Sequence, residues 1–168
     1  MDRIQRPVQS VNPAKLSQVM GDFLGQYAWE VFGTVTFARY EPTFPAARRI
    51  ILRFLRWLEE QRGDYVGAYW VLELHRWRPG SDPVAKACPH AHLLLTNVTG
   101  LDWRSVWRHV YARYGRARFE RVRGGAAHYV AKYVAKEVFE RGSWDIWRPE
   151  VIQRSLGPLR PNSTEFPL

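Results

Sequence analysis

The chain has 168 residues, of which 46% are apolar, and a formal net charge of +9 with an isoelectric point near 10.1. This length predicts one domain around a single core. No apolar run is long enough to span a bilayer and the first residues show no signal-peptide pattern, so we expect a cytoplasmic protein without a membrane partner. The single cysteine, Cys88, cannot form an internal disulfide, and the basic charge favours nucleic acid as the partner.

Hydrophobic periodicity, cap residues and glycine or proline breaks define the expected helices and strands. In chain order they are a helix over residues 13–25 capped by Asn12, a strand over 29–40, a helix over 46–61 ended by Gly63, strands over 65–77 and 90–98, a helix from Asp102 to about Tyr114, a strand over 116–123 and a helix over 126–141. The proline-containing residues 143–168 are expected to be irregular.

From the first strand onward, the order is strand, helix, strand, strand, helix, strand and helix. This is the order of ferredoxin-like or RRM-like split βαβ folds of the α+β class. We therefore expect a central antiparallel sheet of four or five strands, with helices on one face, the other face open, and an extra C-terminal helix. The fold indicates where a site can lie but does not predict an activity.

The last predicted helix contains the repeated sequence YVAKYVAK, which places Tyr129, Lys132, Tyr133 and Lys136 on one side of the helix. Lysine is rare in this chain, because arginine supplies 21 of the 25 basic residues. Two lysines on one helical stripe therefore suggest that compact ammonium charges are needed beside the two phenols. The alternative is a solvated helix face.

A second group of residues has the donor atoms of a metal site. His90 and His92 are two residues apart on a predicted strand, so their imidazoles lie on the same face of the sheet. Glu73 interrupts the apolar sequence WVLEL on the preceding strand, opposite His92 or near it, and a carboxylate there is expected to bind a metal or to pair with an arginine. Two imidazoles and a carboxylate suit Mn²⁺ or Mg²⁺ with open positions for phosphate oxygens.

Arginine and aromatic residues alternate between residues 103 and 123, as expected for a surface that contacts DNA phosphates and bases. The candidate DNA-binding residues are His75, Arg104, Arg108, Arg113, Arg116, Arg118, Arg121 and Arg123.

Three segments in this order, FGTVTF (32–37), HAHLLLT (90–96) and YVAKYVAK (129–136), resemble the motifs of HUH endonucleases, specifically the rolling-circle replication initiators of plasmids and phages. The doubled tyrosine motif resembles the two-tyrosine branch of these initiators. The resemblance covers about residues 29–140. It implies an HUH nuclease domain over 29–142, preceded by a helical extension over 1–28 and followed by an irregular tail of the same domain over 143–168.

The resemblance assigns metal binding to His90 and His92, with Glu73 as the third ligand, and the role of nucleophile to Tyr129 or Tyr133. It implies metal-dependent, sequence-specific nicking of single-stranded DNA at a replication origin through a 5′-phosphotyrosine, followed by strand transfer. Lys132 and Lys136 would stabilise the phenolate charge. A host helicase and polymerase are expected partners, since no GxxxxGK[ST] motif is present.

Two alternatives share some of these features. An HUH-type tyrosine transposase has a similar histidine pair and helical tyrosine, but usually carries a glutamine where this chain has Tyr133. A non-catalytic RRM-like module would stack bases on an open sheet through Trp70, Tyr69 or Phe37. In the segment FGTVTF, Thr34 and Thr36 are expected to belong to a plain core strand, or to brace the site.

Overall fold

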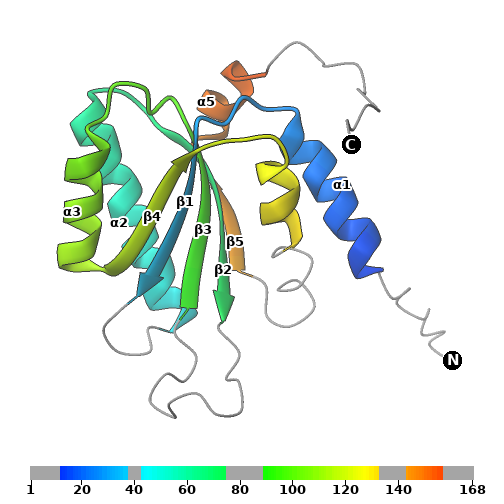
Figure 1. Cartoon of the computed structure of the whole chain (residues 1–168), viewed down its shortest axis with the longest axis horizontal. Coiled ribbons are helices and arrows are strands. Elements are labelled where there is room, and N and C mark those ends of the chain that lie inside the picture. Colours follow the sequence, from blue (N-terminus) through cyan, green and yellow to red (C-terminus); the bar gives the residue numbers. More distant parts are fainter. Residues whose placement is uncertain (1–11, 38–42, 75–88, 133–142, 157–168) are drawn as a thin grey trace, which may run out of the picture.

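The computed structural model describes residues 12–37, 43–74, 89–132 and 143–156. Its elements are α1 (Pro13–Gly25), β1 (Val31–Phe37), α2 (Phe44–Arg62), β2 (Gly67–Leu74), β3 (Pro89–Thr96), α3 (Trp103–Arg113), β4 (Gly115–Arg121), β5 (Ser143–Trp147) and α5 (Pro149–Arg154). Residues 126–132 are also helical. Figure 1 shows that the strands form one sheet between two groups of helices.

The sheet has five strands in the order β4-β1-β3-β2-β5, and every neighbouring pair is antiparallel. The first four strands have the order expected for a split βαβ fold, so the α+β prediction is confirmed. β2 and β3 pair directly along their lengths, as the hairpin prediction required.

The helix ends follow from the sequence. Asn12 accepts hydrogen bonds from the backbone N–H groups of Ala14 and Lys15, and Pro13 occupies the first turn of α1. Gly63 ends α2 in the left-handed conformation, with φ of 71°, which glycine adopts without a steric penalty. Asp102 caps α3 through the backbone N–H of Arg104.

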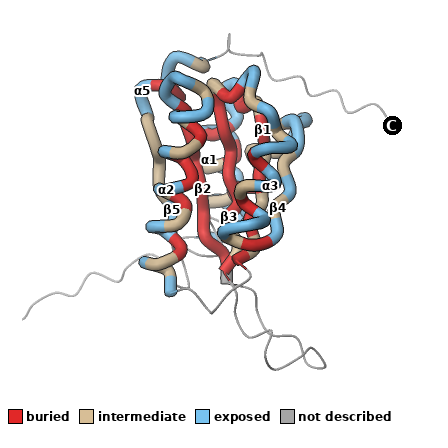
Figure 2. Tube along the Cα trace, turned by 90° about the vertical axis from the view of Figure 1, so that its left-hand side faces the viewer, coloured by how far each residue is buried: buried red, intermediate tan, exposed pale blue. Residues whose placement is uncertain are grey.

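Helices cover both faces of the sheet. On one face, α2 and α3 pack over a core that includes Phe54, Leu58 and Leu93. On the other, α1, α5 and the helix over residues 126–132 pack over a second cluster that includes Tyr69 and Leu94. The prediction of an open face is therefore wrong, and Figure 2 shows the central strands as the most buried part of the chain.

The burial of the sheet also removes the stacking surface that the RRM-like alternative needed. Trp70, Tyr69 and Phe37 are exposed by only 0%, 1% and 2%. Their rings belong to the two cores and are not available for bases, so that assignment is wrong.

Residues 143–156 are not irregular as predicted, because they form β5 and α5. β5 pairs with β2, and α5 packs against the start of the same strand at Gly67. The carboxylate of Glu59 on α2 fixes this segment by accepting hydrogen bonds from Trp147 Nε1 at 3.0 Å and Arg148 Nε at 2.9 Å. In the part of the chain that the structure describes, no helix is long and apolar enough to cross a membrane.

Candidate active site

One cross-strand row of residues passes through His92. In the register of the sheet, His92 lies opposite Thr34 on β1 and opposite Val71 on β2. The row continues to Arg118 on β4 and to Trp144 on β5. Because directly opposite residues share a face, this row extends across the face covered by the helix over residues 126–132.

A second row, nearer the start of β3, contains the other predicted ligands. His90 lies opposite Thr36 on β1 and opposite Glu73 on β2, and Thr36 lies opposite Arg116 on β4. The sequence left open whether Glu73 would face His92 or a neighbour. The register sets it opposite His90, while its carboxylate Oε2 reaches His92 Nε2 at 3.3 Å.

Threonine hydroxyls hold the Nδ1 atoms of both imidazoles. Thr36 Oγ1 lies 2.9 Å from His90 Nδ1, and Thr34 Oγ1 lies 3.3 Å from His92 Nδ1. A hydroxyl both donates and accepts, so each threonine fits either tautomer of its histidine. With Nε2–H donated to Glu73, His92 Nδ1 accepts from Thr34; with the proton on Nδ1, that nitrogen donates to Thr34 and Nε2 becomes a metal donor.

The donor atoms suit a divalent ion, although they do not form a complete site as they stand. His92 and Glu73 are both buried, and the 3.3 Å between Nε2 and Oε2 is close to the roughly 3 Å that separates adjacent ligands of an octahedral ion with bonds of about 2.1 Å. Within the described ranges, no group of three His, Cys, Asp or Glu side chains is gathered closely enough to hold a metal ion. The described geometry is thus a two-residue pair, with His90 in the adjacent row.

Tyr129 lies on the same side of the sheet as the imidazoles. Its ring centroid is 5.6 Å from that of Phe32 and 6.4 Å from that of His92, with both pairs nearly perpendicular. Phe32 in turn stacks parallel to His92 at 6.2 Å. The Tyr129 side chain is 45% exposed, so its phenol is reachable from solvent while its ring edge contacts the buried face.

Tyr69 lies on this face too, but it differs from Tyr129 in its environment. Its side chain is 1% exposed, and burial raises the pKa of its hydroxyl far above the usual range. Tyr69 is therefore held as a neutral core phenol, in ring contact with Trp144 on β5.

The helix that carries Tyr129 is fixed by contacts with the N-terminal helix. Its Val130 and Ala131 are buried in one cluster with Leu24 of α1. His128 Nε2 lies 3.1 Å from Asp22 Oδ1, also on α1. α1 therefore positions the tyrosine helix over the sheet, as Figure 1 shows.

The other predicted residues divide into three groups. Lys132 follows Tyr129 by three residues on the helix and is exposed. Arg116 and Arg118 on β4 share the histidine face, whereas Arg104, Arg108 and Arg113 lie on α3, on the opposite side of the sheet, and Arg121 and Arg123 lie at and beyond the end of β4. Tyr133, Lys136 and His75 lie outside the described residues.

Sequence reasoning missed Phe32 and Trp144 as residues of this face. In FGTVTF, the alternation that sets Phe32, Thr34 and Thr36 on one side was the available signal. The alternation of Trp144 and Ile146 with Asp145 was the corresponding signal for β5, and it was hidden by the prolines that follow.

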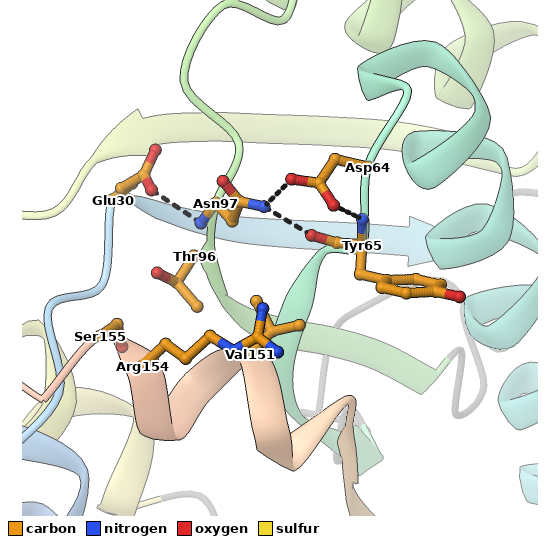
Figure 3. Close-up of a pocket in the computed structure, with 8 residues that line it drawn as sticks. All are labelled: Glu30, Asp64, Tyr65, Thr96, Asn97, Val151, Arg154 and Ser155. Carbon is orange, nitrogen blue, oxygen red and sulfur yellow. Dashed lines mark hydrogen bonds between the residues drawn. The ribbon is translucent and has the colours of Figure 1, made fainter.

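A cavity of about 350 Å³ lies at the other end of the sheet (Figure 3). Its polar groups bond to one another: Asn97 donates its backbone N–H to Glu30, and its side-chain amide to Asp64 Oδ2 and to the Tyr65 carbonyl. The hydrogen bond from Asn97 lowers the pKa of the Asp64 carboxyl. These contacts stabilise the turn after β3, where Asn97 has φ of 59°.

The comparison with protein families gives one match, to the replication-associated protein ORF2 family, over residues 30–138. The matched segment is more than half of the chain and includes Glu73, both histidines and Tyr129. Neither the curated proteins nor the solved structures give a significant match. With the histidine face and the tyrosine helix both inside the matched segment, the chain belongs to the replication-associated protein ORF2 family, which implies a part in initiating rolling-circle replication.

Proposed function

We propose that the protein is an HUH endonuclease of the two-tyrosine type, which nicks one DNA strand at a replication origin and rejoins it. The observation that supports this most directly is the position of Tyr129. Its ring stands against Phe32 and His92 on the one sheet face that also carries His90 and Glu73. A nucleophile and a set of metal donors are thereby adjacent, as phosphoryl transfer requires.

In this proposal His90, His92 and Glu73 hold a divalent ion, Mn²⁺ or Mg²⁺. When bound, the ion supplies charge that polarises the scissile phosphate. Thr36 and Thr34 fix the rotation of the imidazoles and receive or donate the Nδ1 proton as the tautomer requires.

Tyr129 would act as the nucleophile. Its phenol oxygen attacks the phosphorus in line, the bond to the 3′-oxygen breaks, and the leaving oxygen takes up a proton to become a free 3′-hydroxyl. The 5′ side remains on the tyrosine as a phosphodiester, so a 3′-hydroxyl from another strand end can later reverse the step without ATP. Lys132 and Lys136 stabilise the negative charge of the phenolate, and Tyr133 is the second nucleophile for the rejoining step.

Arg116 and Arg118 would hold the backbone of the substrate strand. The two guanidinium groups project from β4 on the histidine face, in the same cross-strand rows as Thr36 and Thr34. A single strand lying across the sheet would meet these charges beside the metal donors. The free 3′-hydroxyl then primes a host polymerase, and a host helicase opens the duplex.

The test is adduct formation on single-stranded origin DNA with Mn²⁺, read as a band that survives denaturation. Tyr129→Phe should abolish the first cleavage, because it removes only the attacking oxygen. Tyr133→Phe should cleave but fail to rejoin. Tyr65→Phe, an exposed tyrosine at the far end of the sheet, is the matched control and should behave as the unmodified protein. Adduct formation unchanged in both Tyr129→Phe and Tyr133→Phe would overturn the proposal.

A further inference from the structure

We propose that the outer face of α3 is a second binding surface for single-stranded DNA, separate from the nicking face. We call Arg104, Trp107, Arg108 and Tyr111 the α3 patch. These positions follow the i, i+3, i+4, i+7 spacing and therefore lie on one side of the helix. All four side chains are exposed, while Val106 and Val110 on the other side of α3 are buried in the core.

The two aromatic rings of the patch form a preformed stacking surface. Trp107 and Tyr111 are stacked with centroids 4.9 Å apart and planes at 21°. They are nevertheless 43% and 56% exposed, although large aromatic rings are normally buried in a domain of this size. A base placed on the outer ring would extend a stack that already exists, which limits the entropy lost on binding.

Trp107 is held in place by its own hydrogen bond. Its indole Nε1–H donates to the backbone carbonyl of Ala117 on β4 at 3.0 Å. The polar end of the indole is thus satisfied by the protein, and the ring surface is left for contacts with a partner.

The charge of the patch selects a polyanion. Arg104 and Arg108 flank the stacked rings, and the carboxylate of the nearby Asp102 accepts hydrogen bonds from the Arg104 backbone N–H and the Ser105 hydroxyl as the cap of α3. Exposed rings between guanidinium groups are what a flexible single strand contacts, through its bases and its phosphates at once.

The patch adjoins the nicking face across the edge of the sheet. Ala117, which accepts the Trp107 hydrogen bond, lies between Arg116 and Arg118, and those two side chains share the face of the histidines. A strand that leaves the nicking face over β4 would pass these guanidinium groups and reach the stacked rings. This path rests on the proposed function, whereas binding at the α3 patch does not require cleavage.

The experiment measures binding of a fluorescently labelled oligothymidine of about 16 nucleotides by anisotropy, without metal ions. Tyr111→Ala should raise Kd about 5- to 150-fold, because it removes one stacked ring. Arg108→Ala should reduce the slope of log Kd against log salt by about 0.7. Tyr65→Ala removes a tyrosine of matching exposure, 54%, at the far end of the sheet and should leave Kd unchanged.

Two outcomes would overturn the inference. One is a Kd for Tyr111→Ala and Arg108→Ala equal to that of the unmodified protein, which would leave the patch to another partner, such as a protein. The other is an equal loss in Tyr65→Ala, which would indicate an unspecific effect. Adduct formation on a short origin oligonucleotide should survive Tyr111→Ala. If the unmodified protein forms no adduct but the binding difference remains, the nicking proposal fails and the patch stands.

Discussion

The threonine hydroxyls behind the histidines give the sharpest test of the proposed metal site. Thr36→Val and Thr34→Val keep the shape of the side chain and remove only the hydroxyl that contacts Nδ1. Loss of such a partner of a metal-binding histidine typically weakens metal affinity about 10- to 100-fold, or about 1.4 to 2.8 kcal/mol. Because the Thr36 contact is 2.9 Å and the Thr34 contact 3.3 Å, we expect Thr36→Val to lie near the upper end of this range and Thr34→Val near the lower.

Isothermal titration of each variant with Mn²⁺ measures the change, and the Mn²⁺ dependence of nicking checks it. The matched control is Thr96→Val on β3, which loses a hydrogen bond to the Ala28 carbonyl at the other end of the sheet. That variant should lose stability but not metal affinity. A protein with both histidines replaced by alanine defines the baseline without the site. Affinities within twofold of the unmodified protein in both Thr36→Val and Thr34→Val would refute the reasoning.

Three further predictions concern stability. Glu59→Ala should lower the free energy of unfolding by about 2 to 4 kcal/mol in urea titrations, because Arg148 and the indole beside it lose their acceptor; a change below about 0.5 kcal/mol would contradict this. Burial lowers the pKa of His109 from 6.5, so the unfolded chain binds a proton first and stability should fall as pH drops through about 6.5. His109→Phe should remove that part of the pH dependence in thermal melts. Gly67→Ala should lower Tm, since the added carbon would lie 2.8 Å from a side-chain atom of α5, whereas Gly124→Ala, with open space around it, should not.

Much of the fold could be predicted because short-range signals fix it. Asn12, Gly63 and Asp102 mark helix ends through contacts with their immediate neighbours. The alternation in the central strands also fixed which side chains share a face, and hence that His90 and His92 do.

The long-range parts could not be read in the same way. The connection between β2 and β3 is long, so the sequence did not fix whether Glu73 would lie opposite His90 or His92. Whether the second sheet face is covered depends on where α1 and the tyrosine helix pack, and their apolar positions do not specify a partner. β5 was missed because pairing with the edge of β2, rather than local propensity, makes residues 143–147 a strand.

The outer edge of β4 also bears on how the protein behaves when concentrated. An edge strand offers unpaired backbone groups to any other strand, and such edges are where separate molecules join into aggregates. Here Trp107 occupies the carbonyl of Ala117, and Arg116, Arg118 and Arg121 would bring like charges together if two copies aligned their edges. Repulsion of this kind weakens as ionic strength rises. Storage at high salt therefore removes the protection that keeps neighbouring molecules from adding strand to strand.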